Sequence, residues 1–251
     1  MASPGIKIIL CLLLSAFYAM TLSGVELQEG DLLFCRAESP NAITDVTCEA
    51  GNMPIDHVGI VHRIGGDNGL LYVIEAKKPA VCLTPIDTFW CENLGGVLIC
   101  RVNADVDIPK SIKRCLMMVG KPYDDLFLPG DSAIYCSELV QLNYVDSQGV
   151  LVFEPVPMSF HDASGQVTDY WQEFYASRGM TVPESAPGTN PGELSLRPQI
   201  TRIAFRLSSV DANLVNKRLK NPATSNPQSG LFSTFASCNV TNLQRWVQLY
   251  P

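Results

Sequence analysis

The sequence has little positive charge and only three histidines among its 251 residues. Lysine and arginine number 18 against 25 aspartates and glutamates, so the formal net charge is -7 and the isoelectric point is near 4.9. Because such a surface gives phosphate groups little to bind, we expect no nucleic-acid partner and no main role at an anionic membrane surface. The local exception is a basic cluster formed by Lys217, Arg218 and Lys220.

Cysteine pairs spaced two to four residues apart, which structural zinc sites usually supply, are also absent. We therefore expect the cysteines of this sequence to be buried or to form disulfides, which are common in exported proteins. If Cys11 leaves with a signal peptide, an even number remains, so the count singles out no free thiol. The remaining cysteines are Cys35, Cys48, Cys82, Cys91, Cys100, Cys115, Cys136 and Cys238.

Segment 1–24 has the layout of a cleavable signal peptide. Lys7 precedes an apolar run from Ile8 to Leu14, and small residues follow. Reading the run on through Leu22 would give a membrane anchor, but polar residues interrupt it and it falls short of the roughly 20 apolar residues of a spanning helix. We predict a secreted or periplasmic protein after cleavage, with contact to a membrane left open.

The remaining chain is long enough for one domain with a sizeable core. Alternation and β-branched residues predict strands, and 3.6-residue periodicity predicts helices. The predicted strands span 31–35, 57–64, 70–75, 96–102 and 200–207, the second and third forming a hairpin. The predicted helices span 108–119, 136–145, 168–178 and 210–219. Strands followed by helices and a late strand are typical of an α+β fold in which helices cover one side of a sheet.

The proline-rich stretch 183–198 is predicted to form no regular element, only an extended crossing or a lid-like loop. Segment 221–230 is polar and contains prolines, so it is predicted to link to a short tail. We accordingly expect a domain over 25–207 and a C-terminal extension of unknown role over 208–251.

Cys136 is the strongest candidate nucleophile. A cysteine attacks as its thiolate, which a helix N-terminus and a neighbouring imidazolium favour. Cys136 opens an apolar helical run after a loop, so unpaired backbone N–H groups would favour negative charge on sulfur and could hold an oxyanion. By position alone, an ordinary small buried residue at a helix start is the better explanation of Cys136.

Two of the three histidines, His57 and His62, lie on one predicted strand and point to opposite faces. Gly59 shares the face of His57 and leaves room there for a substrate or a helix. His161 lies in a loop and looks exposed. Taken alone, each is an ordinary surface or core histidine, but His57 is the best placed to act as a base.

Glu75 ends an otherwise apolar strand that also carries Leu71 and Val73 on the same face. A buried carboxylate is expensive unless it is paired or hydrogen-bonded. If the hairpin forms, the partner could be His57, whose tautomer Glu75 would then fix. The alternative is a solvated residue at the end of a strand.

Together, the segments EGDLLF at 29–34, DHVGIV at 56–61, YVIEA at 72–76, GKPYD at 120–124 and YCSELV at 135–140 occur in a specific order. In that order they resemble the YiiX-like branch of the NlpC-type, papain-like cysteine hydrolases. This branch is circularly permuted, so that its histidine precedes its cysteine, as here. The resemblance covers roughly residues 25 to 207 and implies a papain-like fold with a mostly antiparallel sheet or small barrel packed against helices.

The resemblance also implies a catalytic triad of Cys136, His57 and Glu75. It suggests Tyr135 as a contributor to the oxyanion site or substrate pocket, and it places Tyr123 and Asp124 near the approach to the site. Asp31 is interpreted as structural, capping a turn at the start of a strand. The family does not settle the substrate.

His57 is expected to take the thiol proton, after which Cys136 attacks an amide or ester carbonyl and water resolves the acyl-enzyme. This chemistry needs neither a metal nor an organic cofactor. The expected partner is a peptide-like or acyl-bearing small molecule, from the cell wall or from lipids. A lipid acyl hydrolase or acyltransferase, an inactive binding module and a disulfide-stapled domain without catalysis remain as alternatives.

Overall fold

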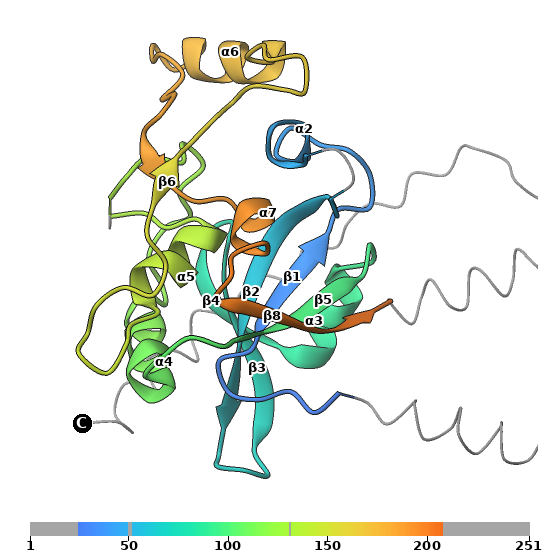
Figure 1. Cartoon of the computed structure of the whole chain (residues 1–251), viewed down its shortest axis with the longest axis vertical. Helices are drawn as coiled ribbons and strands as arrows, with labels where there is room; N and C mark the ends of the chain where they lie inside the picture. The colour runs from blue at the N-terminus through green and yellow to red at the C-terminus, as the bar shows by residue number, and fades with distance from the viewer. Residues whose placement is uncertain (1–24, 50–51, 131, 208–251) are drawn as a thin grey trace, which may run out of the picture.

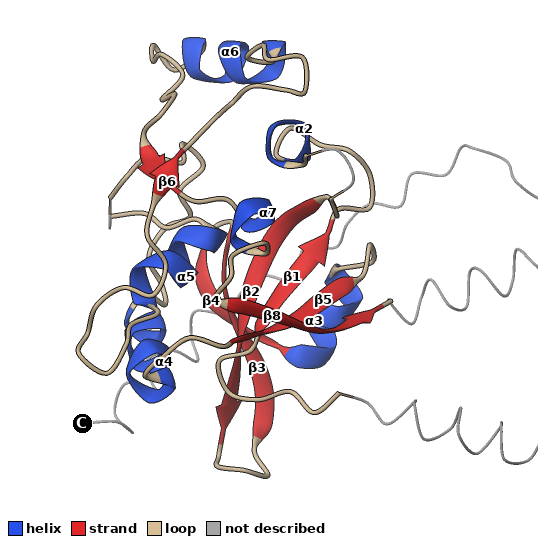
Figure 2. Cartoon of the chain, viewed as in Figure 1, coloured by secondary structure: helices blue, strands red, loops and turns tan. Residues whose placement is uncertain are grey.

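An antiparallel sheet forms the centre of the fold. The computed structural model describes residues 25–49, 52–130 and 132–207. Six strands lie in the order β4-β3-β2-β1-β5-β8, and each neighbouring pair is antiparallel (Figure 2). They are β1 (Leu32–Arg36), β2 (Ile55–Ile64), β3 (Leu70–Lys77), β4 (Ala80–Pro85), β5 (Val97–Val102) and β8 (Ile200–Arg206). The five predicted strands and the β2–β3 hairpin are confirmed, whereas β4 was not predicted.

Helices pack on both faces of the sheet, so the prediction that they cover one side was wrong. On one face lie α4 (Ile108–Met117), α5 (Cys136–Asn143) and α7 (Pro191–Leu194). The opposite face is covered by α3 (Ile86–Glu92), which the sequence analysis missed. Farther out, α2 (Thr44–Thr47), α6 (Asp169–Ala176), β6 (Val156–Pro157) and β7 (Pro187–Gly188) lie toward the top of Figure 1.

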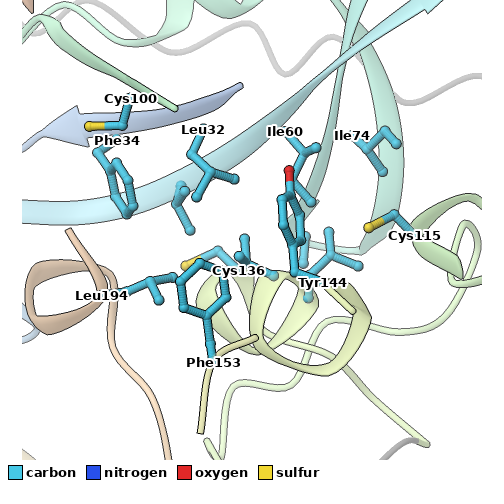
Figure 3. Close-up of a cluster of buried hydrophobic side chains, with 14 of the residues drawn as sticks. Leu32, Phe34, Ile60, Ile74, Cys100, Cys115, Cys136, Tyr144, Phe153 and Leu194 are labelled. Atoms are coloured by element: carbon cyan, nitrogen blue, oxygen red, sulfur yellow. The ribbon is translucent and has the colours of Figure 1, made fainter. Parts of the chain in front are cut away.

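Two apolar cores follow from the alternation of side chains along each strand. Leu32 and Phe34 of β1 point toward α4 and α5, while Leu33 and Cys35 point toward α3. Since β1 lies inside the sheet and is covered on both faces, its sequence is a continuous apolar run. Figure 3 shows the larger core, with strand residues facing Cys136 at the start of α5.

The segment before β8 is packed against the body of the protein, which corrects the prediction for 183–198. Asn190 caps α7 by accepting a hydrogen bond from the N–H of Glu193 at 2.7 Å, and Pro191 takes the first helical turn, where a missing N–H does no harm. Thr189 and Leu194 are buried. The stretch is therefore a fixed crossing with a short helix, while the predicted helix at 210–219 and the predicted tail lie outside the described residues.

No cysteine in the described part of the chain forms a disulfide with another described residue. Most of these cysteines are buried, as expected from the sequence: Cys35, Cys82, Cys100, Cys115 and Cys136. In the same residues no helix is long and apolar enough to cross a membrane. Cys11, Cys238 and the predicted signal peptide lie outside the described residues.

Candidate active site

His57 lies near the start of β2, next to an irregularity in the sheet. Cys35 of β1 pairs with His57 and the next residue of β1 pairs with Ile55, so Asp56 is an extra residue on β2. Such a β-bulge bends the strand and redirects the neighbouring side chains. Asp56 accepts a hydrogen bond from Asn41 Nδ2 at 2.7 Å, which ties the bulge to the preceding loop.

Gly59 shares the face of His57, and its missing side chain makes room for α3. A Cβ atom at Gly59 would lie 2.3 Å from Val73 Cγ1 and 3.2 Å from Phe89 Cε2. The Phe89 ring is buried, and its centroid lies 6.4 Å from that of the His57 ring. Of the two occupants suggested by the sequence, the helix fills this space, and Phe89 covers one side of the imidazole.

Glu75 lies opposite Gly59 in the register of β2 and β3, and therefore diagonal to His57. Its Oε2 is 2.7 Å from His57 Nε2, and its side chain is only 2% exposed. The carboxylate thus has the partner that its burial requires. Because Nε2 is engaged by Glu75, the other ring nitrogen, Nδ1, is the one available to Cys136.

Cys136 is the first residue of α5, after Tyr135 in an extended conformation. N–H groups in the first helical turn lack partners within the helix, and the helix dipole favours negative charge there. Glu138 is buried in the first turn of α5, and burial raises its pKa from 4.5 to about 8. The backbone N–H groups of Tyr135 and Gly130 oppose this rise, so Glu138 interacts with the backbone on either side of the loop that leads to the thiol.

The three side chains form one electrostatic unit. Burial alone would lower the pKa of His57, but hydrogen bonds to Cys136 and Glu75, together with their charges, raise it from 6.5 to about 10. Burial likewise opposes ionisation of Glu75, yet His57, Lys77 and Thr84 together lower its pKa from 4.5 to about 2.

These pKa values set the pH range in which the pair stabilises the fold. The contribution of His57 is complete below pH 6.5 and is lost as the pH rises toward 10. That of Glu75 is complete above pH 4.5 and is lost as the pH falls toward 2. The ion pair therefore stabilises the folded state most between pH 4.5 and pH 6.5.

A pocket beside Cys136 has a mainly apolar wall. Phe127 lines this pocket, whereas Phe89 lies behind His57 and Trp90 packs under Arg206. The apolar lining residues are Ile43, Val46, Phe127, Met158, Phe160, Trp171 and Pro191.

Asp124 supports the loop that carries Phe127. Its two carboxylate oxygens accept hydrogen bonds from the N–H groups of Leu126 and Leu128, each at 2.8 Å. Phe127 between them has a φ of 52°, a left-handed conformation that such a residue adopts only when its surroundings impose it. The ring packs edge-on against Tyr135, so Asp124 shapes the pocket wall from a buried position.

Tyr135 also belongs to the pocket. Its hydroxyl accepts a hydrogen bond from the N–H of Thr189 at 3.2 Å and lies 3.7 Å from Met158 Sδ. Burial is the main reason that the pKa of this phenol is raised, so it stays protonated at physiological pH. A role for Tyr135 in oxyanion or substrate binding remains a prediction.

A family model of permuted papain-like amidase enzymes, the YaeF/YiiX or C92 family, matches residues 26–204. The chain belongs to this family. Its membership confirms the predicted resemblance and the α+β papain-like fold, and it establishes a hydrolase of the cysteine peptidase and amidase type.

Two relatives resemble this chain over most of their length. The protein YiiX of Escherichia coli (strain K12) is 29% identical over 204 residues, which is 77% of this chain and 94% of the relative. A crystal structure of yiiX from Escherichia coli O157:H7, described as a metalloprotein, has a TM-score of 0.59 and 26% identity. That likeness covers 72% of this chain and 98% of the other.

The other residues singled out from the sequence have structural partners in this amidase. Asp31 is buried, accepts a hydrogen bond from the N–H of Gln28 at 2.9 Å and pairs with Arg101, as the structural interpretation predicted. His62 pairs with Glu29 at 2.7 Å. Tyr123 packs against the larger core, and the exposed loop histidine, His161, pairs with Glu184 at 3.2 Å.

Three polar residues at the candidate site were not predicted from the sequence. Lys77 and Thr84 both contact Glu75, and Glu138 is buried in the first turn of the helix that begins at Cys136. The sequence did indicate a contact for Lys77, because Lys77 follows Glu75 by two residues on the same strand and therefore points to the same face. It gave no such indication for Thr84 and Glu138, since their contacts depend on strand β4 and on the loop before α5.

Proposed function

We propose that this hydrolase cleaves an amide or ester bond through a triad of Cys136, His57 and Glu75. The observation that best supports this proposal is that His57 Nε2 lies 2.7 Å from Glu75 Oε2 while Cys136 is close enough to the same ring to raise its pKa. A base held between an orienting carboxylate and a nucleophile at a helix start is the arrangement that thiol acyl transfer requires.

In the first step the sulfur of Cys136 attacks the carbonyl carbon, and the thiol proton resides on His57. Backbone N–H groups at the start of α5 stabilise the oxyanion. His57 then donates its proton to the leaving amine or alcohol, which departs and leaves a thioester on Cys136. Finally, His57 takes a proton from water, the hydroxide adds to the thioester, and the carboxylic acid and free thiol are released.

For the acyl side of the substrate, the pocket favours an apolar group over a cell-wall peptide. Seven apolar side chains line it beside the sulfur, and its one acidic lining residue is Asp56, with no cationic side chain among the lining residues. Phe127, Phe160 and Trp171 belong to one aromatic cluster held by edge-on contacts. The polar lining residues are Thr47, Asp56, Ser137, Ser159, Thr189 and Asn190. An apolar wall with polar groups beside it suits an acyl chain or an aromatic acyl group attached to a polar amide.

Chain length tests this substrate class. Across N-acyl amides of increasing acyl length, we expect kcat/KM to rise by about fourfold per methylene until the pocket is filled, the equivalent of about 0.8 kcal/mol. Phe127→Asn should flatten this slope, because it removes the ring while asparagine tolerates the left-handed backbone. A preference of the wild type for muropeptides over all N-acyl amides would instead identify the cell wall as the substrate source.

The state of the thiol is tested without a substrate. Between pH 8 and pH 6 an ordinary thiol with a pKa of about 8.5 loses about 70-fold of its thiolate. Because the imidazolium of His57 is retained in this range, we expect iodoacetamide to label Cys136 at pH 6 within about tenfold of its rate at pH 8. Mass spectrometry of the labelled peptides maps the site, with the exposed Cys91 as internal comparison. An inert or oxidised Cys136 would refute the enzyme proposal and favour a binding module or a stapled domain.

A metal does not fit the donors of this site, although the yiiX relative is described as a metalloprotein. Among the described residues, no group of three or more histidine, cysteine, aspartate or glutamate side chains is placed to share an ion. Both oxygens of Glu75 already have protein partners. The proposed mechanism therefore contains no step through a metal.

The proposed location of the enzyme is outside the cytoplasm. The apolar segment at 8–14 with its preceding lysine suggests a cleaved signal peptide and a secreted or periplasmic enzyme. Comparing the N-terminal sequence of the protein recovered from the exported and intracellular fractions tests this, and an intact residue 1 in both fractions would contradict it.

A further inference from the structure

The side of Glu75 that faces away from His57 is held as firmly as the side that faces it. Lys77 Nζ lies 2.9 Å from Glu75 Oε1, and the hydroxyl of Thr84 donates a hydrogen bond to the same oxygen. Oε2 receives His57 Nε2 at 2.7 Å. One oxygen of the carboxylate is thus occupied by two donors, and the other is left to the imidazole.

The sheet register creates this arrangement. Glu75 and Lys77 are two residues apart on β3 and share a face. Cys82 of β4 is paired with Glu75, so Thr84, two residues further along β4, lies on that face too. Lys77 Nζ is in turn held by Glu92 Oε2, at the end of α3, at 2.7 Å.

We propose that Thr84 and Lys77 are positioning residues that act on His57 through Glu75. They fix one carboxylate oxygen, so that the other meets Nε2 and Nδ1 stays directed at Cys136. This inference rests on the triad proposed above and extends it to residues that touch neither the substrate nor the sulfur.

The two residues have different physical roles. Thr84 is buried and neutral, so its hydroxyl contributes direction to the carboxylate. Lys77 is 30% exposed and brings a positive charge that balances part of the negative charge of Glu75. Removing Lys77 would leave more of that negative charge to act on the imidazolium of His57.

Few titratable or charged groups lie near His57, so the charge of Lys77 is expected to change the pKa of His57. The thiol of Cys136 approaches it from α5, and Glu75 with Lys77 from β3. From β1, Cys35 is opposite His57 in the register, and burial raises its pKa so that it remains a neutral thiol. Asp56 precedes His57 on β2, and α3 contributes the uncharged ring of Phe89.

The charge role is tested by NMR titration of the histidine ring carbons in the whole protein. Only three histidines are present, and the His57→Gln variant assigns the signal of His57. In Lys77→Met, we expect the His57 midpoint to move upward by roughly one pH unit. Lys78→Met is the matched control, since Lys78 is 70% exposed and pairs with Asp125 instead. A Lys77→Met midpoint that stays unchanged or moves downward would overturn the charge role.

The orienting role is tested by the rate at which iodoacetamide labels Cys136 and by kcat. We expect Thr84→Val to lower both by about 10- to 100-fold, the usual effect of removing a residue that orients a functional side chain. Thr84→Ser retains the hydroxyl and should restore most of the activity. A folded Thr84→Val within about twofold of wild type would overturn this role. If Thr84→Val does not fold, the same criterion is applied to Thr84→Ala. If iodoacetamide does not label Cys136 in the wild type, the triad itself is refuted. If the wild type is labelled but the variants behave like it, only the positioning roles of Thr84 and Lys77 are refuted.

Discussion

Cys136→Ala is expected to reduce kcat on the best N-acyl amide by roughly 10⁶-fold, to the background rate. No other group at the start of α5 can form the thioester, and activation by His57 is useless without the sulfur. Removing a single sulfur atom from a small buried side chain should lower the free energy of unfolding by only about 1 kcal/mol. Progress curves for hydrolysis, with circular dichroism of the same preparations, separate lost chemistry from lost fold.

The matched control is Cys91→Ala. Cys91 is exposed on α3, away from the sulfur of Cys136, and surface substitutions change stability by less than about 0.5 kcal/mol. Its activity should equal that of the wild type. If Cys136→Ala kept measurable turnover on a substrate that the wild type cleaves, the proposed acyl-enzyme would be ruled out.

Glu75→Gln is expected to reduce kcat by about 10⁴-fold, the scale seen when a catalytic imidazole is held in the wrong tautomer. Lys77 is a pure hydrogen-bond donor, so it draws the amide oxygen of the new glutamine toward itself. The amide NH₂ group then faces His57 Nε2, which must accept, and the ring proton moves to Nδ1. A base protonated at Nδ1 cannot take the proton of Cys136.

Stability should respond to Glu75→Gln in a pH-dependent way. The difference in unfolding free energy from wild type should be largest between pH 4.5 and pH 6.5 and should shrink as His57 loses its proton above that range. Urea unfolding at several pH values measures this difference.

Glu92→Gln is the control for the loss of activity in Glu75→Gln. Glu92 contacts Lys77 but is 41% exposed, so the activity of this variant should stay within about fivefold of wild type. If kcat fell no more in Glu75→Gln than in Glu92→Gln, the carboxylate of Glu75 would not be what orients His57.

Local patterns in the sequence were sufficient to predict most of the sheet. Alternating apolar residues identified β2 and β3, and the glycine loop between them identified their hairpin. That hairpin in turn predicted the contact between His57 and Glu75. By contrast, β4 and α3 meet directly at Pro85 and Ile86, and neither proline nor the short apolar run there distinguishes a strand from a helix.

Features that depend on a single residue or on register could not be predicted. The bulge at Asp56 inserts one residue without changing the composition of the strand. Asp124 was expected near the approach to the site, yet it is buried and holds the loop of Phe127 by two hydrogen bonds. Thr84 reaches Glu75 only because β4 pairs with β3 in one register. Such contacts follow from tertiary geometry, which local propensities do not contain.

The order of His57, Glu75 and Cys136 along the chain has a consequence for biosynthesis. A ribosome releases the proposed base His57 and its carboxylate Glu75, on β2 and β3, well before the proposed nucleophile Cys136 on α5. Leu194 of α7, which packs in the same core as Cys136, and β8, which closes the sheet edge beside β5, emerge later still. Because domains acquire their packing as the chain emerges, an incomplete nascent chain has no assembled triad, and hydrolytic competence arises only near the end of translation of the domain.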